Sequence, residues 1–184
     1  MAMIPNVVTH NYDPVRGMGG NICDLPVTDA QRILDGIADS GARRIKTDYL
    51  RRRKAVEDWL IDERTNKLGP TAMDRPMYFF LGDFADGLDP SRPASLVMPL
   101  NAFASGALTF TYGDSMAQGH TPRRFRGRVY TLAEIEAVVA ERGLPDLSRD
   151  RVGFIEVQVW DDGPIRDFIG AQWHGAKAEQ TWKI

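Results

Sequence analysis

The spacing of apolar and polar residues predicts helices in the first third of the chain and strands after it. Apolar side chains recur at helical spacing behind a capping-box pattern, Thr28-Asp-Ala-Gln31, until Gly41 ends the run. A longer helix is predicted from Thr47 to Leu68. Residues 1–27 carry prolines and glycines without a sustained period, so an irregular, turn-rich segment is expected there.

Short runs rich in β-branched and aromatic residues follow the two helices. The predicted strands are Met77–Leu81, Ser95–Met98, Ala107–Tyr112, Gly127–Tyr130 and Val152–Trp160. A capping box at Thr131 begins a third helix that Gly143 ends, and Pro164 is expected to begin a last short one. Helices first and strands later, without strict alternation, favour a single α+β domain over residues 1–184 with N-terminal helices packed on a mainly antiparallel sheet.

Composition narrows the class of protein further. The chain is 43% hydrophobic and 26% charged, its net charge is −2, and it has one cysteine, Cys23. No run approaches the roughly 18 apolar residues of a membrane span, and the first residues lack the features of a secretion signal. We therefore expect a cytoplasmic protein with no membrane partner. No disulfide is possible within the chain, and the spacing of its histidines and carboxylates predicts no bound metal.

Glu156 is the most informative single residue, because it lies in the middle of the most apolar predicted strand. Alternation places it on one face with Phe154, Gln158 and Trp160. A solvent-exposed face would explain the charge, but two aromatic neighbours are unusual there and favour a ligand cleft.

The basic run YLRRRKAVEDWL, residues 49–60, is a second candidate. A solvated helix with an i,i+4 pair between Arg53 and Glu57 is one interpretation. The other is that Arg51, Arg52 or Arg53 binds a phosphate group through its guanidinium fork. Helical counting from Tyr49 brings Arg52 and Arg53 nearest the apolar side.

The N-terminal segment THNYDPVRGMGGN, residues 9–21, is a third candidate. His10, Asn11 and Tyr12 supply hydrogen-bonding side chains, and the glycines after them permit a close approach of backbone to ligand. The segment matches neither of the common glycine-rich phosphate loops, so a plain turn is the competing interpretation.

Four short blocks along the chain, taken in order, resemble the DarT-type ADP-ribosyltransferases over residues about 45–160. The blocks are RPMYFFLGDF at 75–84, SLVMPLNAF at 95–103, LTFTYGDSM at 108–116 and FIEVQVW at 154–160. The resemblance implies a split sheet of ADP-ribosyltransferase type. It also implies NAD as the ADP-ribose donor, a base in single-stranded nucleic acid or a nucleotide as acceptor, and a toxin or defence role with an antitoxin protein as partner.

The same resemblance assigns roles to individual residues. Glu156 matches the catalytic glutamate of the family, and Arg52 or Arg53 matches its catalysis-associated arginine. His10, Asn11, Tyr12, Tyr78 and Arg51 are then the expected NAD-binding residues. Phe154 replaces the Gln or Glu that many protein-modifying transferases carry two residues before the catalytic glutamate, which favours a nucleic-acid acceptor over a protein.

Two other classes of function remain open from the sequence. A non-enzymatic nucleotide or nucleic-acid binding module would use the arginines of residues 51–54 and of RRFRGR at 123–128, where Phe125 is interleaved. A metal-independent ribonuclease would use Glu156 with His10 or His120 as base and acid.

Overall fold

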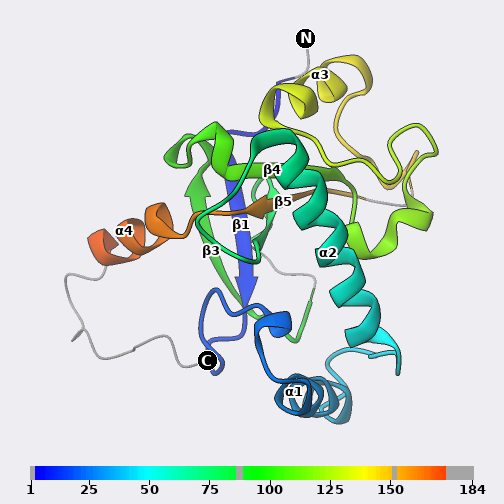
Figure 1. Cartoon of the computed structure of the whole chain (residues 1–184), viewed down its shortest axis with the longest axis vertical. Helices are drawn as coiled ribbons and strands as arrows, with labels where there is room; N and C mark the ends of the chain where they lie inside the picture. Colours follow the sequence, from blue (N-terminus) through cyan, green and yellow to red (C-terminus); the bar gives the residue numbers. More distant parts are fainter. Residues whose placement is uncertain (1–2, 86–88, 151–152, 173–184) are drawn as a thin grey trace.

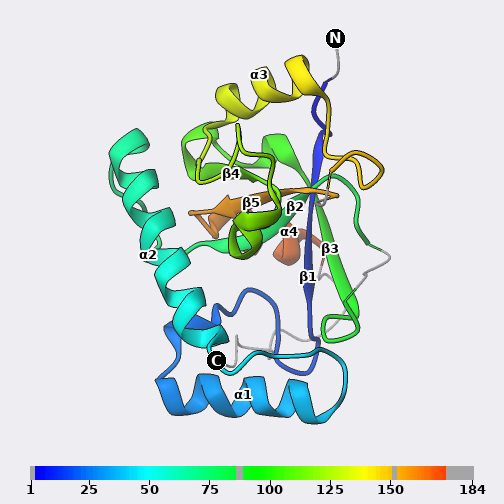
Figure 2. The same ribbon diagram turned by 90° about the vertical axis from the view of Figure 1, so that its right-hand side faces the viewer.

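A computed structural model of the chain describes residues 3–85, 89–150 and 153–172. Five strands form one sheet in the order β3-β1-β2-β5-β4, and every neighbouring pair is antiparallel (Figures 1 and 2). The strands are β1 Val7–Tyr12, β2 Met77–Leu81, β3 Ala94–Pro99, β4 Leu108–Tyr112 and β5 Ile155–Val159. The helices are α1 Val27–Asp39, α2 Tyr49–Leu68, α3 Leu132–Arg142 and α4 Gly163–Gln172. The chain is thus a single α+β domain, as its pattern predicts.

Most predicted elements are present at nearly the expected bounds, and the capping box of α3 forms as predicted, with the Thr131 side chain accepting from the Glu134 amide. Two details of the prediction are wrong. The capping box at Thr28 does not form, because α1 begins at Val27 with Pro26 at its N-cap. Residues 127–130 make only an isolated bridge from Tyr130 to Phe110 instead of a strand. The predicted first residue of the last strand, Val152, lies outside the described residues.

The largest correction concerns the segment 1–27, which contains strand β1 and is not irregular throughout. β1 lies inside the sheet, paired with β3 over its whole length and with β2 over two residue pairs. Thr9 and Asn11 are buried in this strand, so polar residues occupy positions that a sequence pattern assigns to solvent. Neighbouring strands, and not an apolar period, stabilise β1.

The sheet opens between β1 and β2. Register pairs join only Val8 to Leu81 and Thr9 to Phe80, and beyond them the two strands separate. The views show β1 running steeply across the direction of β5 (Figures 1 and 2). Past Thr9 the contact between β1 and β2 is made by a side chain: the His10 ring nitrogen Nδ1 lies 2.8 Å from the carbonyl oxygen of Tyr78.

β5 is buried on both faces, because the main core covers one side and α2 covers the other. Trp160, directly after β5, packs with Leu60 of α2. Seven residues of helix span about 10 Å and four residues of strand about 13 Å. Arg53 on α2 and Glu156 on β5 therefore lie at comparable distances from Leu60 and Trp160, and their charges are close enough to interact.

In the described parts of the chain, no helix combines the length and the apolar character that crossing a membrane requires.

Candidate functional site

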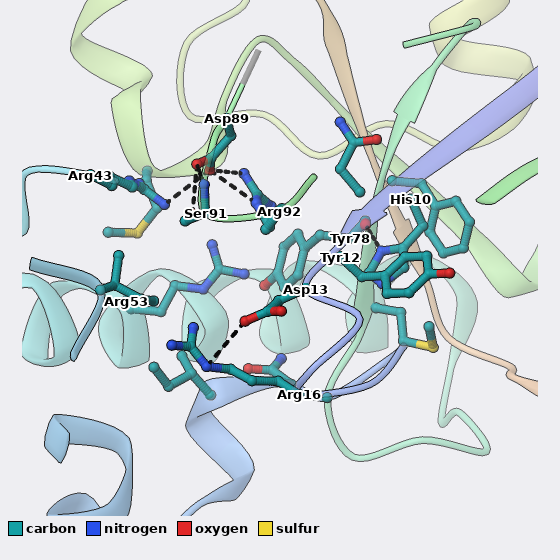
Figure 3. A pocket seen from close by; sticks show the side chains of 18 of the residues that line it. His10, Tyr12, Asp13, Arg16, Arg43, Arg53, Tyr78, Asp89, Ser91 and Arg92 are labelled. Atoms are coloured by element: carbon teal, nitrogen blue, oxygen red, sulfur yellow. Dashed lines mark hydrogen bonds and ion pairs between the residues drawn. The ribbon is translucent and has the colours of Figure 1, made fainter. Parts of the chain in front are cut away.

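A cleft of about 590 Å³ opens where β1 and β2 separate, between the N-terminal loop that follows β1 and the first turns of α2 (Figure 3). Its wall includes six of the predicted site residues: His10, Asn11, Tyr12, Arg53, Tyr78 and Glu156. These six residues come from four elements, β1, α2, β2 and β5, which thus meet around one cavity.

Glu156 lines the cleft and is 7% exposed. Burial, and next the negative charge of Asp114, raise the pKa of Glu156 from 4.5 to about 7, while the nearby Arg53 acts in the opposite direction. The solvent-exposed interpretation of Glu156 is therefore wrong. Its carboxylate is instead poised between its two protonation states near neutral pH, as is common for groups that carry chemistry.

A buried chain of hydrogen bonds lies behind Glu156, on the face of the sheet toward α2. The Gln158 amide nitrogen donates to Glu156 Oε1 at 3.0 Å and to Thr111 Oγ1 at 3.3 Å. Thr109 donates to the Gln158 amide oxygen at 3.0 Å, and the Trp160 indole nitrogen donates to Thr109 at 2.8 Å. Gln158 and both threonines are fully buried, so this network fixes the position of the carboxylate from inside the protein.

Arg53 projects from α2 into the cleft and is held at two points. Its Nε donates to Glu57 Oε1 at 3.0 Å, and its guanidinium carbon lies 3.7 Å from the centre of the Tyr78 ring. Among the described residues, its two terminal nitrogens make no hydrogen bond. The anchored Nε leaves the outer edge of the guanidinium free to receive an anionic ligand.

Glu57 is a fully buried carboxylate that joins three parts of the chain. Its Oε1 accepts from the Asn21 amide at 2.9 Å, from Arg53, and from the Tyr78 hydroxyl at 3.1 Å, and its Oε2 accepts from Arg75 at 2.9 Å. The i,i+4 pair of Arg53 and Glu57 is thus present, but it is buried and not a solvated surface pair. Asn21 also donates to the carbonyl of Pro76 at 3.1 Å, which fastens the N-terminal loop to β2.

His10 is held in one tautomer at the edge of the cleft. A carbonyl oxygen can only accept, so Nδ1 carries the proton that binds the Tyr78 carbonyl, and Nε2 accepts from the Gly19 amide at 3.4 Å. Gly19 has a φ of 84°, which orients that amide toward the ring. Burial lowers the pKa of His10 to about 4. The imidazole is therefore neutral at physiological pH, and it stacks with Tyr12 at 6.0 Å between ring centres.

The outer end of the cleft carries paired charges, drawn in Figure 3. Asp89 accepts from Arg92 at 2.9 Å, with Arg43 at 3.9 Å, and Arg16 pairs with Asp13 at 3.4 Å. Four arginines thus surround the opening: Arg53 and these three, Arg16, Arg43 and Arg92. Each has an acidic neighbour, so the cleft carries dispersed charge and no strong net field.

Two predicted site residues lie outside the cleft. Arg51 is on the exposed side of α2, where its side chain is 80% exposed and pairs with Asp48 at 3.5 Å. Arg52 donates to the carbonyl of Met116 at 3.1 Å and so links α2 to the segment after β4. Of the three arginines that helical counting left open, only Arg53 lines the cavity.

Sequence reasoning did not identify Glu57, Asn21 or Asp114 as parts of the site. The i,i+4 count from Arg53 did reach Glu57, but it was interpreted as half of a solvated surface pair. Asp114 follows β4 and caps the next turn by accepting from the Met116 amide at 2.7 Å, a position that a turn pattern explains without any ligand. Asn21 had no signal beyond its glycine-rich neighbourhood.

The second basic run does not form the stacking surface expected of a nucleic-acid binding module. Phe125 is 4% exposed and packs against Tyr112 with ring centres 4.8 Å apart. Arg124 pairs with Glu141 at 2.6 Å, and Arg126 donates to the Gly119 carbonyl at 2.8 Å. The aromatic ring between these arginines belongs to the core and is closed to a base.

Within the described ranges, no group of three or more His, Cys, Asp or Glu side chains is arranged to hold a metal ion.

Comparison with models of known protein families finds no match to the chain, and comparisons with curated protein sequences and with solved structures find none either. The interpretation of the cleft therefore rests on its own residues.

Proposed function

We propose that the protein is an NAD-dependent ADP-ribosyltransferase that uses the cleft to bind NAD. The observation that carries this proposal is the convergence of Glu156 and Arg53 in one cavity with an aromatic wall. A buried carboxylate and an anchored guanidinium are the two charged groups that cleavage of NAD requires, one for a ribosyl cation and one for the pyrophosphate.

The reaction breaks the bond between the ribose C1′ and the nicotinamide nitrogen. The bonding electrons leave with nicotinamide, and the ribose develops positive charge in an oxocarbenium-like transition state. Ionised Glu156 would stabilise that charge near the 2′-hydroxyl. The acceptor atom then bonds to C1′ and releases its proton to water.

Arg53 suits the pyrophosphate because only its Nε is engaged by Glu57. Its terminal nitrogens can make two parallel hydrogen bonds to phosphate oxygens without losing that anchor. The neutral ring of His10 with Tyr12 beside it offers a flat surface for a heteroaromatic ring. The proposed acceptor is a base in single-stranded nucleic acid, and the proposed context is a toxin or defence system.

The pKa of Glu156 gives the proposed activity a defined pH dependence. A carboxylate that must be ionised and that titrates at about 7 makes the rate rise through pH 7 and level off about one unit above it.

The test is nicotinamide release from NAD in the presence of single-stranded DNA, RNA or cell lysate. We expect turnover by the wild-type protein, loss of about 100-fold or more in Glu156→Gln, and no change in Glu136→Gln, a control at an exposed position of α3. Absence of turnover with all three acceptors would overturn the proposal. Salt-sensitive nucleic-acid binding without turnover would favour the binding module, and RNA cleavage in EDTA would favour the ribonuclease.

A further inference from the structure

The hydrogen bonds behind Glu156 have a direction that the chemistry of their members determines. An indole N–H can only donate, so Thr109 Oγ1 accepts from Trp160. The Thr109 hydroxyl proton is then directed to its other neighbour, the amide oxygen of Gln158 at 3.0 Å.

This direction fixes which end of the Gln158 amide faces the cleft. With its oxygen held by Thr109, the amide turns its nitrogen toward Glu156 at 3.0 Å and toward Thr111 at 3.3 Å. Thr111 can accept there because its own proton goes to the Gly113 carbonyl at 2.9 Å. Rotation of the amide by half a turn would leave the buried Thr109 hydroxyl without its acceptor, which is costly away from water.

We propose that Gln158 is a positioning residue whose amide, held in one orientation by Trp160 and Thr109, keeps an N–H donor permanently against the carboxylate of Glu156. The importance of that carboxylate for catalysis rests on the proposed function, but the arrangement itself does not. Trp160 thus acts on Glu156 from further along the same face of the sheet, through two intermediate side chains.

A fixed donor favours the ionised form of a carboxylate. The other groups that face Glu156 are Asp114 and Ser115 from the segment after β4, Arg53 from α2 and Tyr78 from β2. Burial and Asp114 act against ionisation, whereas Arg53, Ser115 and Gln158 support it. Removing the amide donor should therefore shift the titration of Glu156 to higher pH, by about one unit for a charged hydrogen bond in a buried site.

The experiment is a pH titration of the free protein labelled with ¹³C at glutamate side-chain carboxyls, the Glu156 signal being assigned by its loss in Glu156→Gln. We expect a midpoint near 7 in the wild type, about one unit higher in Gln158→Leu. The control is Thr111→Val, which removes the second partner of the same amide and leaves the bond to Glu156. Its midpoint should stay within about 0.3 units of the wild type, because that bond is unchanged.

Thr109→Val provides a second variant if Gln158→Leu does not fold. It frees the amide to rotate while Gln158 stays in place, so the Glu156 midpoint should rise, by less than the loss of the whole amide. An unchanged midpoint in a folded Gln158→Leu or Thr109→Val protein, or an equal shift in Thr111→Val, would overturn the proposal.

NAD is absent from this titration, so a failed search for transferase activity would leave its outcome unaffected. If turnover is found, the acidic limb of the pH–rate profile should move with the titration midpoint in each variant. A merely structural role for Gln158 would lower the rate at all pH values without moving that limb.

Discussion

Replacing Glu156 by Gln should stabilise the protein at alkaline pH while removing the activity proposed for it. The folded protein holds the Glu156 proton up to a pKa of about 7, whereas the unfolded chain releases it near 4.5. Between these two values the folded state binds more protons than the unfolded state. The free energy of unfolding therefore falls as pH rises through this window, and above it the buried charge is a standing cost.

The magnitude follows from the two pKa values. At about 1.4 kcal/mol for each unit of pKa, ionisation of Glu156 should cost about 3 kcal/mol in full, and roughly 2–3 kcal/mol between pH 5 and pH 8. Glutamine has nearly the same shape and can still accept from Gln158, so the variant should avoid this cost without creating a cavity.

The assay is equilibrium unfolding in urea at pH 5 and pH 8. The stability of Glu156→Gln relative to the wild type should increase by roughly 2–3 kcal/mol from the lower to the higher pH. Glu136→Gln, at an exposed position, should show no such trend. If the difference in free energy of unfolding between Glu156→Gln and the wild type were the same at both pH values, burial and Asp114 would not raise the pKa of Glu156.

Other predictions concern the groups around Glu156. Arg53→Lys should weaken NAD binding about tenfold or more by calorimetry, because it loses the fork and the Nε anchor, whereas Arg51→Lys on the exposed side should leave the affinity unchanged. Glu57→Gln should lower the free energy of unfolding by about 3–5 kcal/mol, because two cations lose a buried partner, against less than about 0.5 kcal/mol for the exposed Asp58→Asn; a loss below about 1 kcal/mol would contradict this. The imidazole NMR signals of His10 should not titrate between pH 5 and 8, since its pKa is about 4, and a midpoint in that range would contradict the assigned tautomer and burial.

The position of Glu156 could be predicted because a strand has a strict period of two. Apolar residues at 155, 157 and 159 fixed one face, so the other face had to carry Glu156, Gln158 and Trp160 together. What the pattern could not decide was whether that second face was exposed. The answer lies in α2, whose Leu60 packs on Trp160 and closes the face from a distance of about 100 residues in sequence.

For the three arginines at 51–53, in contrast, the pattern could not predict which side chain lines the cleft. The apolar side counted from Tyr49 is only partly buried, and the face that packs inward carries Glu57 and Arg64 beside Leu50 and Leu60. Charged residues on a buried helix face give no apolar stripe, so the sequence favoured Arg52 and Arg53 over Arg51 but could not separate those two. Similarly, β1 was not predicted because it is stabilised by β3 and β2. Its residues pair with residues that lie more than 70 positions later in the chain.

Glu57 has a further consequence for the way in which the protein folds. Its partners Asn21 and Tyr78 lie 36 and 21 residues away along the chain, in segments that cannot meet through local structure alone. Contacts of this kind form only after the entropy of closing long loops has been overcome. Until these contacts form, Glu57 has only Arg53 of its own helix as a partner, and an intermediate that buried it would leave Oε2 without the hydrogen bond from Arg75. We therefore expect incomplete folds to keep this region hydrated and the cleft to appear only with the final, cooperative step.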